Sequence, residues 1–135
     1  MALKVLDSWA LLAFFEDEPA AEEVERLLLK ATQGAHHLLL CVVNWGEVYY
    51  NTLRRSSPAA AEQKAREIAA MPIELVPVEA DLHLVRQAAQ YKASGKLAYA
   101  DAFAAALARL RNAELVTGDQ DFKTVADEIK ISWLK

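Results

Sequence analysis

Four acidic residues, Asp7, Glu47, Asp101 and Asp119, occupy similar places relative to the apolar runs of the sequence. Asp7 and Asp119 each follow a short apolar run, and Glu47 lies just after a longer one. Asp101 lies near the start of an alanine-rich segment that precedes the run before Asp119. Ligands of open α/β sheets bind at the carboxyl ends of the strands. These four side chains are therefore expected to converge, although they are far apart along the chain.

A group of carboxylates of this kind is suited to divalent metal ions. Carboxylates that lie close together repel one another unless a cation joins them. Hard cations such as Mg²⁺ and Mn²⁺ prefer oxygen ligands, and the helix N-termini expected beside Asp7, Glu47 and Asp101 favour the ionised form of these ligands. A pair of such ions can hold a phosphodiester and activate water for its hydrolysis.

Each acid also has a purely structural explanation. Turn, cap or first-turn helix positions account for the following residues without any chemistry: Asp7, Asp101, Asp119 and Asp121. Glu47 has the most specific alternative, because Asn44-Trp45-Gly46-Glu47 matches a capping box. In that interpretation Asn44 is the N-cap, and Glu47 is the third helical residue and bonds back to the Asn44 amide.

The elements that would position these acids can be predicted from the apolar pattern. Short apolar runs predict strands, the last of them at an edge, over residues 3–7, 38–43, 73–78, 115–116 and 129–133. Helical spacing and Pro or Asn start signals predict helices over residues 8–16, 19–31, 44–55, 58–71, 80–93, 99–111 and 120–127. Strands that alternate with helices indicate βαβ units. We expect one domain over residues 1–135, a three-layer α/β/α sandwich with a mostly parallel sheet of about five strands.

Composition narrows the class of protein. The chain has 19 acidic and 15 basic residues, for a formal charge of −4, which argues against a general nucleic-acid coat but not against a nuclease that reaches phosphate through cations. Cys41 is the sole cysteine, so no internal disulfide can form. No apolar run approaches the ~18 residues typical of a membrane span, and no signal peptide is recognisable. A cytoplasmic protein without a membrane association is the expectation.

Four segments together resemble the PIN-domain nucleases, and among them the VapC-type toxins of toxin–antitoxin pairs. The matching segments are Val5-Leu6-Asp7-Ser8-Trp9-Ala10-Leu11-Leu12, Asn44-Trp45-Gly46-Glu47-Val48, Leu97-Ala98-Tyr99-Ala100-Asp101-Ala102-Phe103-Ala104-Ala105-Ala106 and Leu115-Val116-Thr117-Gly118-Asp119-Gln120-Asp121-Phe122. They occur in the order of the family and span nearly the whole chain. The resemblance implies a parallel sheet with flanking helices and an endoribonuclease, a hydrolase that requires Mg²⁺ or Mn²⁺.

The resemblance also assigns roles to residues. Asp7 and Asp101 match the firmest metal ligands of the family, Glu47 and Asp119 match the next two acids, and Asp121 matches a less constant one. Small hydroxyl positions beside the site correspond to Ser8 and Thr117. Gly118 departs from the family, because many relatives have a larger, often basic residue there. Lys92 and Lys96 precede the Asp101 segment and are candidates to guide RNA.

The resemblance further implies an antitoxin that covers the acidic groove, and a homodimer. The mechanism expected is hydrolysis of an RNA phosphodiester that leaves a 5′-phosphate. Two other functions remain open from the sequence. One is a phosphohydrolase that uses Asp7 as a covalent phosphate carrier, for which Lys123 is a poor candidate as the required lysine. The other is a non-catalytic RNA- or protein-binding module of the same fold.

The three histidines, His36, His37 and His83, have no zinc-binding spacing.

Overall fold

The computed structural model describes residues 2–135. Five strands form its sheet: β1 (Ala2–Leu6), β2 (His36–Cys41), β3 (Ile73–Val76), β4 (Glu114–Thr117) and β5 (Ile131–Trp133). The helices are α1 (Ser8–Phe15), α2 (Ala21–Thr32), α3 (Val42–Arg55), α4 (Pro58–Ala69), α5 (His83–Ser94), α6 (Tyr99–Leu110) and the 3₁₀ helix η1 (Gln120–Val125). All five predicted strands are present, and each predicted helix has a counterpart.

The sheet has the strand order β3-β2-β1-β4-β5, and every strand pair is parallel. The central strand β1 pairs with β2 on one side and with β4 on the other. All carboxyl ends therefore point toward the same edge of the sheet. The prediction of a mostly parallel sheet is confirmed, and β5 is an edge strand as predicted.

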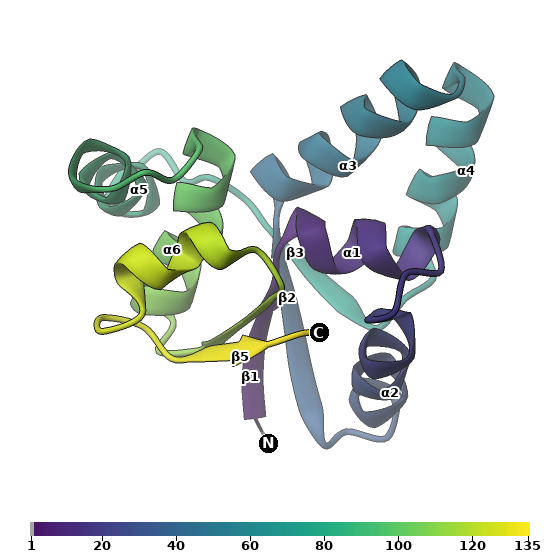
Figure 1. The fold of residues 1–135 in the computed structure, drawn as a ribbon, viewed down its shortest axis with the longest axis horizontal. Coiled ribbons are helices and arrows are strands. Elements are labelled where there is room, and N and C mark those ends of the chain that lie inside the picture. The colour runs from purple at the N-terminus through teal and green to yellow at the C-terminus, as the bar shows by residue number, and fades with distance from the viewer. Residues whose placement is uncertain (1) are drawn as a thin grey trace.

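Helices cover both faces of the sheet, which gives the predicted three layers (Figure 1). Successive strand residues face opposite layers. Val5, Leu39 and Leu115 pack in one core with α5, α6 and η1, whereas Leu6, Leu38, Leu40 and Val116 pack in a second core with α1, α2 and parts of α3 and α4. A strand buried on both faces is apolar at every position, which explains the continuous apolar run of β2.

One boundary differs in a way that affects the site. Residues 42 and 43 were predicted to continue the second strand, but α3 begins at Val42, directly after β2. Two adjacent β-branched valines favour a strand. The β propensity of these valines is overridden by tertiary structure. β2 ends where its partner β3 ends, at the pair Cys41 and Val76, and Val43 packs against the core from the start of α3.

Smaller differences occur at other helix starts. Pro19 was predicted at the first position of the second helix, but it lies before Ala20, the N-cap of α2.

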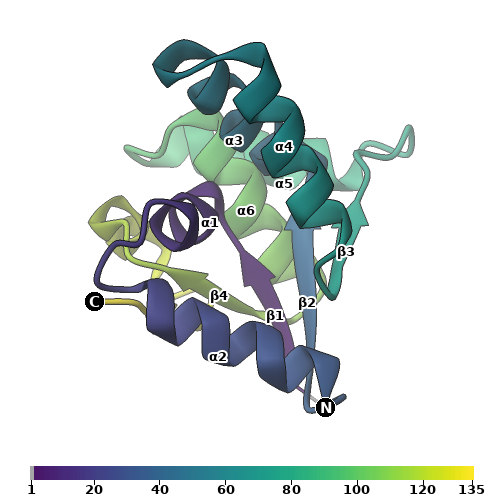
Figure 2. The same ribbon diagram turned by 90° about the vertical axis from the view of Figure 1, so that its right-hand side faces the viewer.

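The α3–α4 pair forms a hairpin that projects beyond the carboxyl edge of the sheet (Figure 2). Within residues 2–135, no helix is both long and apolar enough to cross a membrane.

Candidate active site

The structure places the predicted acids at the carboxyl edge of the sheet. Asp7 follows β1, Glu47 lies in α3 just beyond β2, and Asp119 follows β4. Asp101 lies in the first turn of α6, which packs against α3 and runs beside β1 and β4. Four segments that are remote in sequence therefore bring their acids to one end of the molecule, as the alternation of strands and helices predicted.

Asp7 is fully buried and has a structural role at the start of α1. One carboxylate oxygen, Oδ1, accepts a hydrogen bond from the Ala10 amide at 2.9 Å and caps the helix. The other, Oδ2, accepts from the Thr117 hydroxyl at 2.5 Å. Burial raises the pKa of Asp7 to about 7; the two hydrogen bonds oppose the rise, and the Asp101 and Asp119 carboxylates add to it. Each carboxylate oxygen has a second lone pair, so these bonds orient the group without exhausting it.

Asp101 has a different environment. Its side chain is 9% exposed, and among the described residues it has no hydrogen-bond donor. Burial raises the pKa of Asp101 to about 7, and repulsion from Glu47, Asp119 and Asp121 adds to the rise. A buried carboxylate is normally hydrogen-bonded or paired with a cation. Of the two buried acids, Asp7 and Asp101, Asp101 is therefore the one whose charge is less compensated by the protein.

Glu47 is held by two donors, and the capping-box interpretation of it is wrong. The Ser8 hydroxyl donates to Glu47 Oε1 at 2.6 Å, and the Asn44 side-chain amide donates to the same oxygen at 3.3 Å. The N-cap of α3 is Cys41, so Asn44 is the third helical residue and Glu47 the sixth. Glu47 therefore lies in the second turn of α3 and cannot bond back to an N-cap amide. The helix begins two residues earlier than the sequence indicated.

Asp119 lies in the turn that joins β4 to η1, and Asp121 is the second residue of η1. Asp119 Oδ1 accepts a hydrogen bond from the Asp121 amide at 2.9 Å and caps η1. The Asp119 amide in turn donates to the Thr117 hydroxyl at 3.0 Å. Thr117 thus bonds to both Asp7 and the Asp119 backbone, which ties the ends of β1 and β4 together. Asp121 is exposed at the margin of the group.

The charge of this group is not neutralised by the protein. Within residues 2–135, the ion pairs involve other acids: Glu114, Glu74, Glu16 and Glu128. The donor set consists of carboxylate, hydroxyl and amide oxygens, which suits a hard divalent cation in chemistry and charge. As the side chains stand, no three acidic, histidine or cysteine side chains of the described residues lie close enough to share an ion. The fit therefore rests on donor type and unbalanced charge.

Gly118 lies between Thr117 and Asp119, and the ring of Trp9 fills the space where a side chain at this position would lie. A Cβ atom at Gly118 would lie 2.2 Å from Cη2 of Trp9 and 2.5 Å from Cζ2 and Cζ3. The indole ring therefore occupies the space that a side chain at this position would need. The sequence indicated the departure at Gly118 but not its cause, because nothing in the pattern relates position 9 to position 118.

The two candidate RNA-guiding lysines differ in their surroundings. The Lys92 ammonium donates to the Leu97 carbonyl at 2.9 Å, so it stabilises the turn that leads into α6. Lys96 lies in that turn and is exposed. Other metal-binding or acid–base residues lie elsewhere: Cys41 is buried in the core, and His36 and His37 lie at the opposite end of β2.

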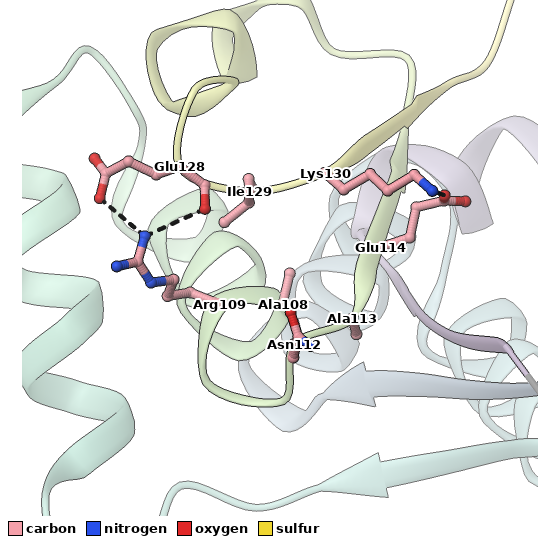
Figure 3. Close-up of a pocket in the computed structure, with 8 residues that line it drawn as sticks. All are labelled: Ala108, Arg109, Asn112, Ala113, Glu114, Glu128, Ile129 and Lys130. Carbon is pink, nitrogen blue, oxygen red and sulfur yellow. Dashed lines mark hydrogen bonds and ion pairs between the residues drawn. The ribbon is translucent and has the colours of Figure 1, made fainter.

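A small pocket of about 130 Å³ lies at the opposite, amino-terminal edge of the sheet. Its basic side chains are engaged by acids (Figure 3): Arg109 binds Glu128 through both the carbonyl and the carboxylate, and Lys130 lies 3.4 Å from Glu114. Both basic side chains that line the pocket therefore already have an acidic partner. The acidic group at the carboxyl edge remains the candidate active site.

Comparisons with known proteins identify the family of the chain. A family model described as the PIN domain matches residues 4–128. Among curated proteins, none matches the sequence.

Several solved structures share the fold. The VapBC2 complex of Rickettsia felis, solved with a DNA fragment from its promoter, has a TM-score of 0.74 at 14% identity, with 98% of this chain and 99% of that chain covered. DNA-bound VapBC of Salmonella typhimurium has a TM-score of 0.72 at 17% identity, with 98% of both chains covered. VapC20 of Mycobacterium tuberculosis, described as a toxin that cleaves the sarcin–ricin loop, has a TM-score of 0.68 at 18% identity, with 92% and 95% covered.

PIN domains are generally nucleases, a class of hydrolase, and they generally use a divalent metal ion. The acidic group at the carboxyl edge of this sheet agrees with that class. The family model covers nearly the whole chain and includes the five acids of the candidate site, which are Asp7, Glu47, Asp101, Asp119 and Asp121. The chain belongs to the PIN domain family.

Proposed function

We propose that this protein is a Mg²⁺- or Mn²⁺-dependent endoribonuclease and the toxin of a type II toxin–antitoxin pair. The observation that carries the proposal is the group of five acids without a basic partner among the described residues, with Asp101 buried and without a hydrogen-bond donor. Such an arrangement is unfavourable unless a cation binds. Membership of the PIN family supports nuclease chemistry, and the fold shared with VapBC proteins supports the role in a toxin–antitoxin pair.

Asp7 and Asp101 would hold the principal ion, with Glu47 and Asp119 completing the group and Asp121 at its margin. A divalent cation there supplies positive charge to the phosphate and makes the attacking water more acidic. Water adds to phosphorus, the bond from phosphorus to the 3′ oxygen breaks, and the products carry a 5′-phosphate and a 3′-hydroxyl. Ser8 and Thr117 orient Glu47 and Asp7 through the hydrogen bonds described above. Lys96, which is exposed in the turn before α6, would contact the RNA backbone.

The alternative in which Asp7 carries a covalent phosphate fits the structure poorly. Asp7 has no exposed surface, and both of its oxygens are hydrogen-bonded. A phosphoryl group is much larger than a cation and would need an open approach to one oxygen. A non-catalytic binding module also fits poorly, because it would have no need to keep uncompensated acids buried together.

Cleavage of single-stranded RNA by purified protein tests the proposal. We expect cleavage with Mg²⁺ or Mn²⁺, none in excess EDTA, and none from Asp7→Asn or Asp101→Asn. Asp127→Asn is the matched control, because Asp127 is exposed and outside the acidic group. Mg²⁺ at about ten times its dissociation constant should also add roughly 1.4 kcal/mol to the free energy of unfolding of the parent. Cleavage that persists in EDTA, or full activity in both site variants, would show that the proposal is wrong.

A further inference from the structure

Asn44 is a buried polar residue that the proposed ligand set does not include. Its side chain is fully inaccessible, although it lies in the first turn of α3 beside the acidic group. The Nδ2 group donates two hydrogen bonds, to Glu47 Oε1 at 3.3 Å and to the carbonyl oxygen of Ala100 at 3.0 Å. Ala100 immediately precedes Asp101. The Asn44 side chain thus links the Glu47 carboxylate to the backbone carbonyl that immediately precedes Asp101.

The orientation of this amide is determined by its neighbours. Both neighbours of Nδ2 are acceptors, so exchanging the nitrogen and oxygen would bring Oδ1 against two oxygens and leave both bonds unmade. In the orientation observed, Oδ1 is buried and has no partner among the described residues. An unpartnered buried acceptor is destabilising and calls for an explanation. Asn44 therefore keeps its two donor bonds at the expense of an unsatisfied oxygen.

The two bonds restrict how Glu47 and Asp101 can move relative to each other. Glu47 Oε1 also accepts from Ser8 at 2.6 Å, so that oxygen is held from α1 and α3 together. The second bond of Asn44 joins α3 to the start of α6. Loss of Asn44 would leave Glu47 with one donor and would remove a direct polar link between the two helices that carry these acids.

We propose that Asn44 is a positioning residue, which holds Glu47 and the start of α6 so that Glu47 and Asp101 can bind a common divalent cation. This inference rests on the proposed function. It also reverses the role suggested by the sequence, in which Asn44 only caps a helix. Residues that orient metal ligands typically change metal affinity by roughly 10–100-fold when they are replaced.

Asn44→Leu tests the inference, because leucine has a similar shape but neither donates nor leaves an unpartnered oxygen. We expect the urea midpoint in EDTA to be unchanged or raised, since replacing an imperfectly satisfied polar group by an apolar one is often neutral or stabilising. The Mg²⁺ concentration that gives half of the maximal thermal stabilisation should rise at least about tenfold. Thr52→Val is the matched control: Thr52 is buried in the same helix and donates to the Val48 carbonyl, away from the acids, so its Mg²⁺ midpoint should equal that of the parent.

A second measurement uses the parent protein and does not depend on the variant folding. The side-chain NH₂ signals of Asn44 in ¹H–¹⁵N spectra should exchange slowly with solvent and shift on addition of Mg²⁺, with the midpoint seen in thermal melts. If the parent responds to Mg²⁺ but Asn44→Leu responds equally, or the Asn44 signals stay unchanged, the positioning role is wrong while the proposed function stands. If the parent neither binds Mg²⁺ nor cleaves RNA, the proposed function fails, and this inference with it.

Discussion

The contact between Trp9 and Gly118 predicts a strong coupling between two positions beside the site. In Gly118→Ala the new Cβ would lie 2.2 Å from the edge of the Trp9 ring, well inside van der Waals contact. The methyl group and the indole cannot both keep their places. Trp9 is half-buried, so its ring must rotate or the turn between β4 and η1, which carries Asp119, must shift.

The magnitude follows from two opposing effects. Overpacking a well-filled site costs roughly 1–3 kcal/mol, while replacing glycine by alanine stabilises by about 0.4–1 kcal/mol through the unfolded chain. We therefore expect Gly118→Ala to lower the free energy of unfolding by roughly 1–2 kcal/mol. For a chain of this size that is a fall in melting temperature of several degrees.

A double-mutant cycle isolates the contact. Leucine at position 9 ends before the space filled by the six-membered ring of the indole, so in a Trp9→Leu background Gly118→Ala should be neutral or slightly stabilising. The coupling energy from urea unfolding of the four proteins should be about 1–3 kcal/mol. An equal cost of Gly118→Ala in both backgrounds would show that the ring does not occupy this space.

Two further predictions concern the acids and their donors. Asp7 and Asp101 have folded-state pKa values of about 7 against ordinary values of 3.8. Between these pH values the folded state therefore binds more protons than the unfolded state. The free energy of unfolding in EDTA should then fall as pH rises from about 4 to 7. Urea midpoints across this range should show a smaller slope for Asp7→Asn, and a midpoint that rises with pH would contradict the assignment. Thr117→Val should destabilise the protein by roughly 1–3 kcal/mol, because it leaves Asp7 Oδ2 and the Asp119 amide without their partner. Thr117→Ser keeps the hydroxyl and should lose much less in the same urea assay, so equal losses in the two variants would count against the bonding role.

The sequence was sufficient to predict the architecture and the location of the acids. Apolar runs that alternate with helical patterns indicate a parallel sheet whatever the packing details, and acids at run ends must lie at one edge of such a sheet. The five strands and the positions of Asp7 and Asp119 follow from this rule, whereas Asp101 lies in the first turn of the helix that leads back to β4. The burial of Cys41 also agrees with its place in a continuous apolar run, because such a run is buried on both faces of the sheet.

Tertiary structure decided the features that depend on contacts between remote segments. The start of α3 at Val42 depends on where β3 ends, and that shift turned Asn44 from a cap into a donor to Glu47 and Ala100. The bond from Thr117 to Asp7 and the Trp9 ring over Gly118 each join segments more than 100 residues apart. Periodicity and capping rules describe neighbours within a few residues along the chain. They therefore predict which elements form, whereas side-chain contacts between elements depend on how those elements pack.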